Sequence, residues 1–347
     1  MTTTPTALYP TFSQLIDDQL VVDGAWLDLT NATDWYLAGK IVSPVQVPGE
    51  APQSDLGIDG RLLSGRILRS ALAGSYGDAS KDGFVAFGER AIPCVGQAID
   101  PLSFKCRKIF YSHKIDAERV SRYNALGVNG LIKALAVPRR QAAIVREKAW
   151  RDLFLTTANW SNTVAAGTAW DQAGSTPVKD IGAACHKVGE FVAPNTMIIS
   201  YAAANALTTN AEFLAGLPRD IDSATVRMDR MADLLKSRFS LDRVFIGRAN
   251  ADTSRKADGS AINGIWGSGV WVGYLSDNLA AVDGDVMADD EMSVSAAVSI
   301  VAQDWTPTIK PIEAGEDDDS YTALVRLTEA LVVAYPQLGC TLTGALT

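Results

Sequence analysis

Histidine and cysteine are scarce in this sequence of 347 residues, and neither forms a pattern typical of catalysis or metal binding. Only His113 and His186 are present and no Gly-x-Ser-x-Gly motif occurs, which leaves few options for a Ser–His or Cys–His dyad. The cysteines lie far apart, without a Cys-x-x-Cys pair, at Cys94, Cys106, Cys185 and Cys340. We therefore expect reduced, partly buried thiols, and we predict no catalytic residues, no metal ion and no cofactor.

Long hydrophobic runs and a basic charge balance are missing as well. No run of about 18 apolar residues occurs, so we expect no membrane span. Residues 1–5 contain neither a basic nor an apolar segment, which predicts no secretory signal and synthesis in a cytoplasm. The net charge of -9 argues against a dedicated nucleic-acid binder. It does not exclude a container for DNA, because a shell lining must avoid gripping its contents.

The composition and the apolar pattern predict a folded protein with two projecting segments near its N-terminus. Hydrophobic residues make up 47% and charged residues 20%, as in ordinary globular proteins, and the length permits one to three domains. Residues 1–45 hold short apolar clusters between turn-forming residues, which indicates an extended arm that needs another surface. Residues 46–112 predict a long hairpin with arms at 61–69 and 102–111 and a turn-rich tip at 74–78.

The apolar period becomes helical between residues 115 and 158. Asp116 is placed to cap a helix that ends near Gly127, and Pro138 is placed to begin a longer one. We expect an apolar stripe on the longer helix at Ala142, Val145, Ala149 and Leu153. Basic residues occupy its other faces at Arg139, Arg140, Arg146, Lys148 and Arg151. They could touch nucleic acid or acidic loops of an adjacent subunit, and the modest excess of positive charge favours subunit pairing.

The remainder predicts an α/β region followed by a long hairpin. Asp180 is placed to cap a helix, and further helices are expected at 201–207 and 228–239. A buried strand is expected at 197–199, and further strands at 244–246 and 270–272. Strands at 305–313 and 321–334 are joined by an acidic loop at 314–320. An apolar segment, 336–342, follows the second of these strands.

Three segments resemble phosphate-binding or calcium-binding motifs in composition but lack the residue spacing of those motifs. Gly264–Gly269 lacks the Lys-Ser/Thr of a phosphate loop, so we interpret it as a turn that sets the side chain of Trp266. The acidic clusters Asp289–Glu291 and Glu316–Asp319 lack the alternating spacing of an EF-hand. Each is interpreted as a solvated loop or an inter-subunit contact, with opportunistic divalent binding as a minor alternative.

Several short phrases between Trp170 and Tyr274 resemble, in order and spacing, the tailed-bacteriophage major capsid proteins of the HK97-like fold. The phrases are Pro177–Ile181, Ala193–Ser200, Leu207, Asp242–Gly247, Ile265–Gly267 and Val270–Tyr274. The resemblance implies an α+β fold with an N-arm, an E-loop, a P-domain containing a long spine helix, and an A-domain with a central mixed sheet. Its implied boundaries are 1–45 for the arm, 46–112 for the E-loop, 113–178 with 305–335 for the P-domain, and 179–304 with 336–347 for the A-domain.

The same resemblance implies a major capsid protein that self-assembles into an icosahedral head around phage dsDNA. Its partners would be copies of itself in pentamers and hexamers, a scaffolding protein, a portal, a decoration protein in some cases, and DNA contacted non-specifically. It would be found in the virion after assembly in the host cytoplasm, with no membrane involved. The proposed inter-subunit contacts are Glu316, Asp317, Asp318, Asp319, Lys81, Arg139 and Arg140.

Two other functions remain open on the sequence. An encapsulin-type nanocompartment shell would have the same fold and would differ in its neighbouring genes. A small-molecule α/β enzyme would need convergent titratable groups in a pocket, which the sequence does not offer clearly. Lys81 is a conceivable cross-linking donor, but no asparagine partner or catalytic acid can be named, so no cross-link is predicted.

Overall fold

The computed structural model describes most of the chain from residue 36 onwards. The described residues are 36–46, 64–70, 99–127, 129–216, 228, 230–252, 261–277, 279–282, 285–288, 294–311 and 320–347. Residues 37–347 form one compact unit, which is described below. Among the described residues, no helix combines the length and apolar character that a membrane crossing requires.

A long antiparallel hairpin forms the centre of one sheet. Its strands β13 (Ala297–Pro311) and β14 (Ser320–Val333) pair from Ala297↔Val333 to Pro311↔Tyr321. The sheet order is β1-β13-β14-β4, with β1 (Pro44–Gln46) parallel to β13 and β4 (Arg107–Asp116) antiparallel to β14. The predicted hairpin is confirmed, although β13 begins eight residues earlier than expected. Its acidic loop lies outside the described residues.

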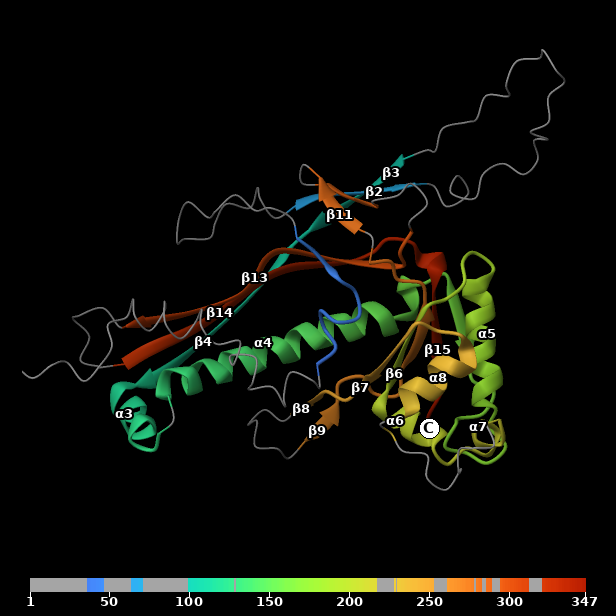
Figure 1. The fold of residues 1–347 in the computed structure, drawn as a ribbon, viewed down its shortest axis with the longest axis horizontal. Helices are drawn as coiled ribbons and strands as arrows, with labels where there is room; N and C mark the ends of the chain where they lie inside the picture. Colours follow the sequence, from blue (N-terminus) through green and yellow to red (C-terminus); the bar gives the residue numbers. More distant parts are fainter. Residues whose placement is uncertain are drawn as a thin grey trace, which may run out of the picture. The chain divides into compact units, whose positions relative to one another are not determined.

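Helix α4 (Gly130–Leu155) runs along this sheet and contacts β14 and β4 (Figure 1). The prediction that the helix begins at Pro138 is wrong. Asn129 caps it, because its side-chain oxygen accepts from the backbone N–H groups of Leu131 and Ile132 at 3.1 and 3.2 Å. Pro138 lies inside the helix and is buried, so the backbone hydrogen bond that proline cannot donate is lost within a packed face.

The expected apolar stripe on α4 is also placed wrongly. Of its four members only Ala142 is buried, whereas Ala149 is exposed. Because the helix begins at Gly130, the buried face follows spacings of three and four residues from there. It consists of Leu131, Leu135, Pro138, Ala142, Arg146, Trp150 and Phe154, with Glu147 beside it. Two charged residues therefore lie on the packed face of this helix.

The shorter helix α3 (Ala117–Ala125) precedes α4 and packs against it. It follows Asp116 and ends before Gly127, which has a φ of +74°, so the predicted bounds are confirmed. The Asp116 side chain forms no capping hydrogen bond. The two helices approach closely at Gly130, where a Cβ atom would stand 2.7 Å from the backbone oxygen of Val120.

A five-stranded mixed sheet forms the second large layer. Its order is β5-β15-β10-β6-β7, with bounds Asn162–Ala165, Gly339–Thr343, Val270–Gly273, Thr196–Ser200 and Arg243–Gly247. Strand β6 is buried throughout, as predicted, and β10, which was predicted as a strand, is buried throughout as well. The helices beside the sheet are α5 (Pro177–Gly189), α6 (Tyr201–Leu207), α7 (Ala211–Ala215) and α8 (Met231–Phe239). The core between them includes Ile181, Val188, Leu207 and Leu235.

Asp180 does not cap helix α5, contrary to the prediction. The N-cap residue is Thr176, and Pro177 occupies the first helical position. Asp180 lies in the first turn, where a carboxylate is favoured by the helix dipole. Its Oδ2 accepts a hydrogen bond of 3.0 Å from the indole Nε1 of Trp170, and both residues are buried.

A third sheet contains the arms of the first predicted hairpin. Strands β2 (Ser64–Ser70) and β3 (Ile99–Lys105) pair antiparallel, in the order β11-β12-β2-β3 with β11 (Leu279–Val282) and β12 (Asp285–Ala288). The pairing of the two arms is confirmed, but the second arm ends at Lys105. The rest of the expected arm, 107–111, lies in β4 and pairs with β14 of the hairpin sheet, so that part of the prediction is wrong. The predicted tip at 74–78 lies outside the described residues. The remaining elements are β8 (Asn250–Asp252), β9 (Ile262–Gly264) and two short 3-10 helices at Thr157–Asn159 and Pro336–Leu338.

The close contact at Gly130 gives a first test. We expect Gly130→Ala to lower the free energy of unfolding by about 1–3 kcal/mol, because the added methyl group meets the backbone of α3. Gly182→Ala in helix α5 is the matched control, since nothing lies within 4 Å of the added Cβ. It should raise the free energy of unfolding by up to about 1 kcal/mol through helix propensity. Urea denaturation measures both, and equal effects would contradict the close approach of α3 and α4.

Candidate assembly site

A buried carboxylate joins three separate parts of the described chain. Glu147, in the second half of α4, has no exposed surface. Its two oxygens accept hydrogen bonds from the backbone N–H of Leu37 at 3.0 and 2.9 Å and from that of Ala38 at 2.7 Å. Oε1 also accepts from the indole Nε1 of Trp266 at 2.6 Å. Glu147 therefore ties helix α4 to the segment 37–46 and to the turn 265–268.

Each donor is positioned by its own local structure. Leu37 begins a turn closed by the hydrogen bond from Lys40 N–H to its carbonyl, and Ile41 beyond it is fully buried. Trp266 lies in a turn that follows β9, where Gly267 adopts a φ of +54° that favours glycine. The Trp266 ring packs on Gly247, where a Cβ atom would stand 2.4 Å from it. The interpretation of this glycine-rich segment as a turn that sets Trp266 is confirmed.

The surroundings of Glu147 move its pKa in opposite directions. Burial raises the pKa of this carboxyl above its usual range, because removal from water disfavours the charged form. The hydrogen bonds from Leu37, Trp266 and Ala38 and the charge of Arg146 lower it in part. Because the folded-state pKa lies above the unfolded-state value, the stability contribution is fully present below the unfolded-state pKa. It is lost as the pH rises through the folded-state pKa.

The adjacent residue, Arg146, binds the hairpin sheet. Its Nε and a terminal nitrogen donate to the two oxygens of Glu329 on β14 at 2.7 and 2.8 Å, and both side chains are almost fully buried. Ser299 on β13 donates a further hydrogen bond of 2.8 Å to Glu329. The prediction that Arg146 lies on an outer face of the helix is therefore wrong. Arg146 and Glu147 point about 100° apart on the helix and so reach different neighbours.

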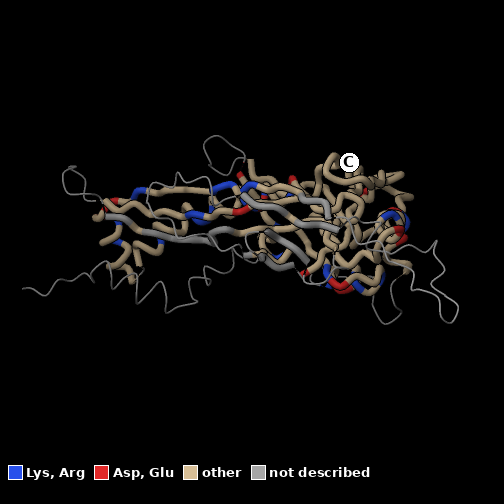
Figure 2. Tube along the Cα trace, turned by 90° about the horizontal axis from the view of Figure 1, so that it is seen from above, with Lys and Arg blue, Asp and Glu red and all other residues tan. Residues whose placement is uncertain are grey.

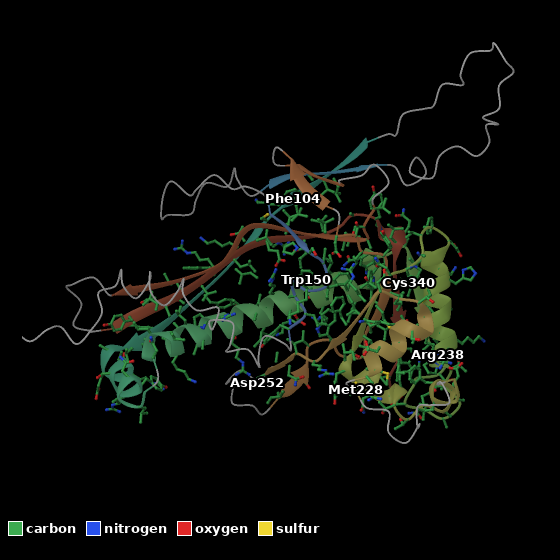
Figure 3. The ribbon with its side chains drawn as sticks, viewed as in Figure 1. Phe104, Trp150, Met228, Arg238, Asp252 and Cys340 are labelled. Carbon is green, nitrogen blue, oxygen red and sulfur yellow. The ribbon has the colours of Figure 1, made fainter. Side chains whose placement is uncertain are left out.

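We call Arg146, Glu147, Trp266 and Glu329 the polar hub. Through it, one turn of α4 fixes the segment 37–46, both strands of the long hairpin and the turn 265–268. A cluster of aromatic rings, made of Trp150, Phe154, Trp160 and Trp271, then joins the end of α4 to the five-stranded sheet. Figure 3 labels Trp150 on α4. The hub is a joint between parts of the subunit and offers no exposed group to a substrate.

The predicted contact residues lie away from the hub or outside the described residues. Arg140 is exposed on α4. Arg139 is half-buried, and desolvation lowers the pKa of its guanidinium. Lys81 and the acidic residues 316–319 lie outside the described residues. The role of these residues in contacts between subunits therefore remains a prediction.

The exposed surface holds an aromatic group that the sequence interpretation did not single out. Phe110 on β4 is 47% exposed, and two cations lie over its ring. Lys108 Nζ is 5.3 Å and Arg326 Cζ 5.2 Å from the ring centroid. The alternation of basic and apolar residues at 105–111 was visible in the sequence, but the pairing of β4 with β14 that brings Arg326 there was not. We call Lys108, Phe110 and Arg326 the Phe110 cluster.

The thiols and histidines show no catalytic arrangement in the described part of the chain. Cys106, Cys185 and Cys340 are free, as expected, and burial raises the pKa of each to about 11. Cys94 lies outside the described residues. His186 is exposed beside Glu190, with 3.9 Å between the imidazole Nδ1 and a carboxylate oxygen. No group of three or more potential metal ligands occurs among the described residues.

Part of this sequence matches a known protein family, and the whole fold is similar to solved structures. The family model of phage major capsid protein E matches residues 147–262, which begin at Glu147 and end at the first residue of β9. A phage-related protein from Bordetella bronchiseptica RB50 has a similar structure, with a TM-score of 0.58 and 17% identity, covering 90% of this chain and 93% of that one. The chain has the HK97-like capsid fold. Its resemblance to the tailed-phage major capsid proteins is thereby confirmed.

Two further solved structures are similar at lower scores. A virus-like particle from Pyrococcus furiosus has a TM-score of 0.48 and 12% identity, covering 92% of this chain and 96% of that one. The capsid of the cyanophage P-SCSP1u has a TM-score of 0.49 and 8% identity, covering 88% and 87%. No curated protein sequence is significantly similar to this chain.

The polar hub can be tested through its indole donor. We expect Trp266→Phe to lower the free energy of unfolding by about 1–3 kcal/mol, because Glu147 loses a hydrogen bond while most of the ring remains. Trp266→Ala should cost about 3–5 kcal/mol. The matched control is Trp271→Phe, because the buried Nε1 of Trp271 has no hydrogen-bond partner among the described residues. Chemical denaturation measures all three.

A smaller loss for Trp266→Phe than for Trp271→Phe would contradict the role of the indole donor. Glu147→Gln supplies a second readout, because the amide cannot titrate. The unfolding free energy of that variant should depend less on pH than that of the wild-type chain. The wild-type chain gains stability from this group as the pH falls.

Proposed function

We propose that this chain is a major capsid protein, which assembles with copies of itself into an icosahedral head around phage DNA. The match of its central residues to the phage major capsid protein E family, within a chain of HK97-like fold, carries this conclusion. A coat protein needs extended surfaces and stable joints between its layers, and the polar hub supplies such a joint. Closed shells are built by repeating the same contacts around symmetry axes.

The elements of the fold correspond to the parts of a shell subunit in this proposal. Helix α4 with the long hairpin sheet would form the P-domain, within 113–178 and 305–335. The five-stranded sheet with its helices would form the A-domain, within 179–304 and 336–347. Residues 46–112, which contain β2 and β3, would form the E-loop, and residues 1–45 the N-arm. Subunits would meet as pentamers and hexamers, with a scaffolding protein, a portal and a decoration protein as further partners.

The two alternative functions receive less support. The family match is to phage coat proteins, so an encapsulin-type compartment is not favoured. A structural capsid family also favours a structural role over the α/β enzyme. The protein would be found in the virion, after assembly in the host cytoplasm.

Electron microscopy of the purified full-length chain tests the function directly. We expect closed, symmetric shells or ring-shaped capsomers, formed by the chain alone or with its scaffolding protein co-expressed. Shells that enclose a cargo enzyme instead of DNA would favour the encapsulin alternative. A chain that stays monomeric at every concentration and with every scaffold tested would overturn the proposal.

The acidic loop is expected to take part in contacts between subunits. Replacement of Glu316, Asp317, Asp318 and Asp319 by Ser should leave the subunit folded and weaken assembly, with the loss most evident at low salt. Light scattering at increasing ionic strength measures assembly, and circular dichroism checks the fold. If the variant assembles like the wild-type chain at every salt concentration, these residues do not form inter-subunit ion pairs.

A further inference from the structure

The Phe110 cluster lies on the face of the hairpin sheet that is turned away from α4. Glu329 of β14 reaches Arg146 of α4, and side chains alternate along a strand, so Arg326 three residues earlier points to the opposite face. Phe110 pairs directly with Arg326 across β4 and β14, which places the ring on the same face. The burial pattern of β4 agrees, because Phe110 is more exposed than Ile109 and Tyr111 on either side.

Two like charges share one aromatic ring in this cluster, and nothing described neutralises them. Lys108 precedes Phe110 by two residues on β4, Arg326 pairs with Phe110 from β14, and both cations approach the ring. Neither forms an ion pair with a described residue. The Nε of Arg326 is buried and has no hydrogen-bond partner among the described residues. A guanidinium group in this condition is suited to a carboxylate, which accepts two parallel hydrogen bonds from it.

The cluster belongs to a strongly basic part of an acidic chain. Residues 105–151 contain twelve Lys and Arg against three Asp and Glu, a net charge of +9 in a chain of -9. Figure 2 shows this distribution, with Lys and Arg recurring along the part of the tube that holds α3, α4 and the hairpin strands. The remaining residues therefore carry a large negative excess, which includes four consecutive acidic residues at 316–319.

We propose that the Phe110 cluster binds the acidic loop Glu316–Asp319 of a second copy of this chain. The inference rests on the proposed function and names the surface that receives the loop, in place of the earlier pairing with Arg139 and Arg140. A basic flank and an acidic tip on one hairpin are complementary between copies. Such a head-to-tail contact, repeated around an axis, closes into a ring.

A second copy is the occupant that the proposed function supplies. Arg326 lies six residues along β14 from Ser320, which corresponds to about 20 Å at the rise of a β-strand, so the basic flank and the acidic residues belong to different parts of one hairpin. In a shell of identical subunits, the flank of one copy and the acidic loop of another can meet at a repeated contact. DNA phosphates are the other chemistry that would suit two cations and a ring, but the negative charge of the chain favours a protein partner.

Charge reversal on both sides of the contact tests the proposal in the full-length chain. We expect Lys108→Glu with Arg326→Glu to lower the yield of shells at low salt by about tenfold or more. Replacement of residues 316–319 by Lys should do the same. The two sets combined in one chain should restore assembly, because the ion pairs form again with reversed signs. Lys179→Glu, an exposed change of the same charge on α5, is the matched control and should leave the yield unchanged.

Sedimentation velocity measures the yield, electron microscopy identifies the particles, and thermal unfolding checks that each subunit is folded. If the double variant does not fold, Lys108→Glu alone is used, since Lys108 is exposed. Normal shell yield from the charge-reversed flank would overturn the inference, and so would a combined variant no better than its parents. Normal shells that retain less DNA would overturn it in favour of nucleic acid. If the wild-type chain forms no shells at all, the proposed function fails, and this inference with it.

Discussion

The buried carboxylate of Glu147 is the constraint on which the arrangement of this subunit depends. A carboxyl group without exposed surface is stable only when hydrogen-bond donors surround it, because the loss of water costs several kcal/mol when the group is charged. Here the donors come from residues far apart in the sequence, namely Leu37, Ala38 and Trp266. The packing of helix α4 therefore depends on the segment 37–46 and on the turn 265–268.

The second charged pair extends the same requirement to the hairpin. Arg146 and Glu329 are both almost fully buried, and Ser299 completes the group from the neighbouring strand. Removal of one partner from such a pair leaves an uncompensated charge, so the pair acts as an all-or-none contact. A single turn of α4 thus makes the helix, the hairpin and the segment 37–46 cooperative. Buried contacts of this kind suit a shell subunit, because its sheets and helices must keep their relative positions when neighbouring subunits bind.

The sequence predicted the strands better than the long helix, for identifiable reasons. Strands such as β6 and β10 are recognised in the sequence as short apolar runs. The strands of the hairpin β13–β14 are recognised by the alternation of apolar and polar residues. The start expected for helix α4, at Pro138, is too late because proline is typical of a first helical turn. The residue that marks the true start is the N-cap Asn129. A helix that begins at Pro138 does not include Leu131, so the buried face that runs from Leu131 through Ala142 to Arg146 is not recognised. A charged pair in a helix also looks solvated, so the polar hub could not be predicted without its distant partners.

Charged side chains are paired differently inside the subunit and on its outer face. Inside, each buried ion of the polar hub meets a donor or an opposite charge within the same chain. On the outer face, Lys108 and Arg326 are held together around Phe110 although they repel one another. Such a surface gains stability when an acidic group of another molecule reaches it. In the proposed shell, association would therefore lower the free energy at the hairpin, where two described cations lie together without an ion pair to any described residue.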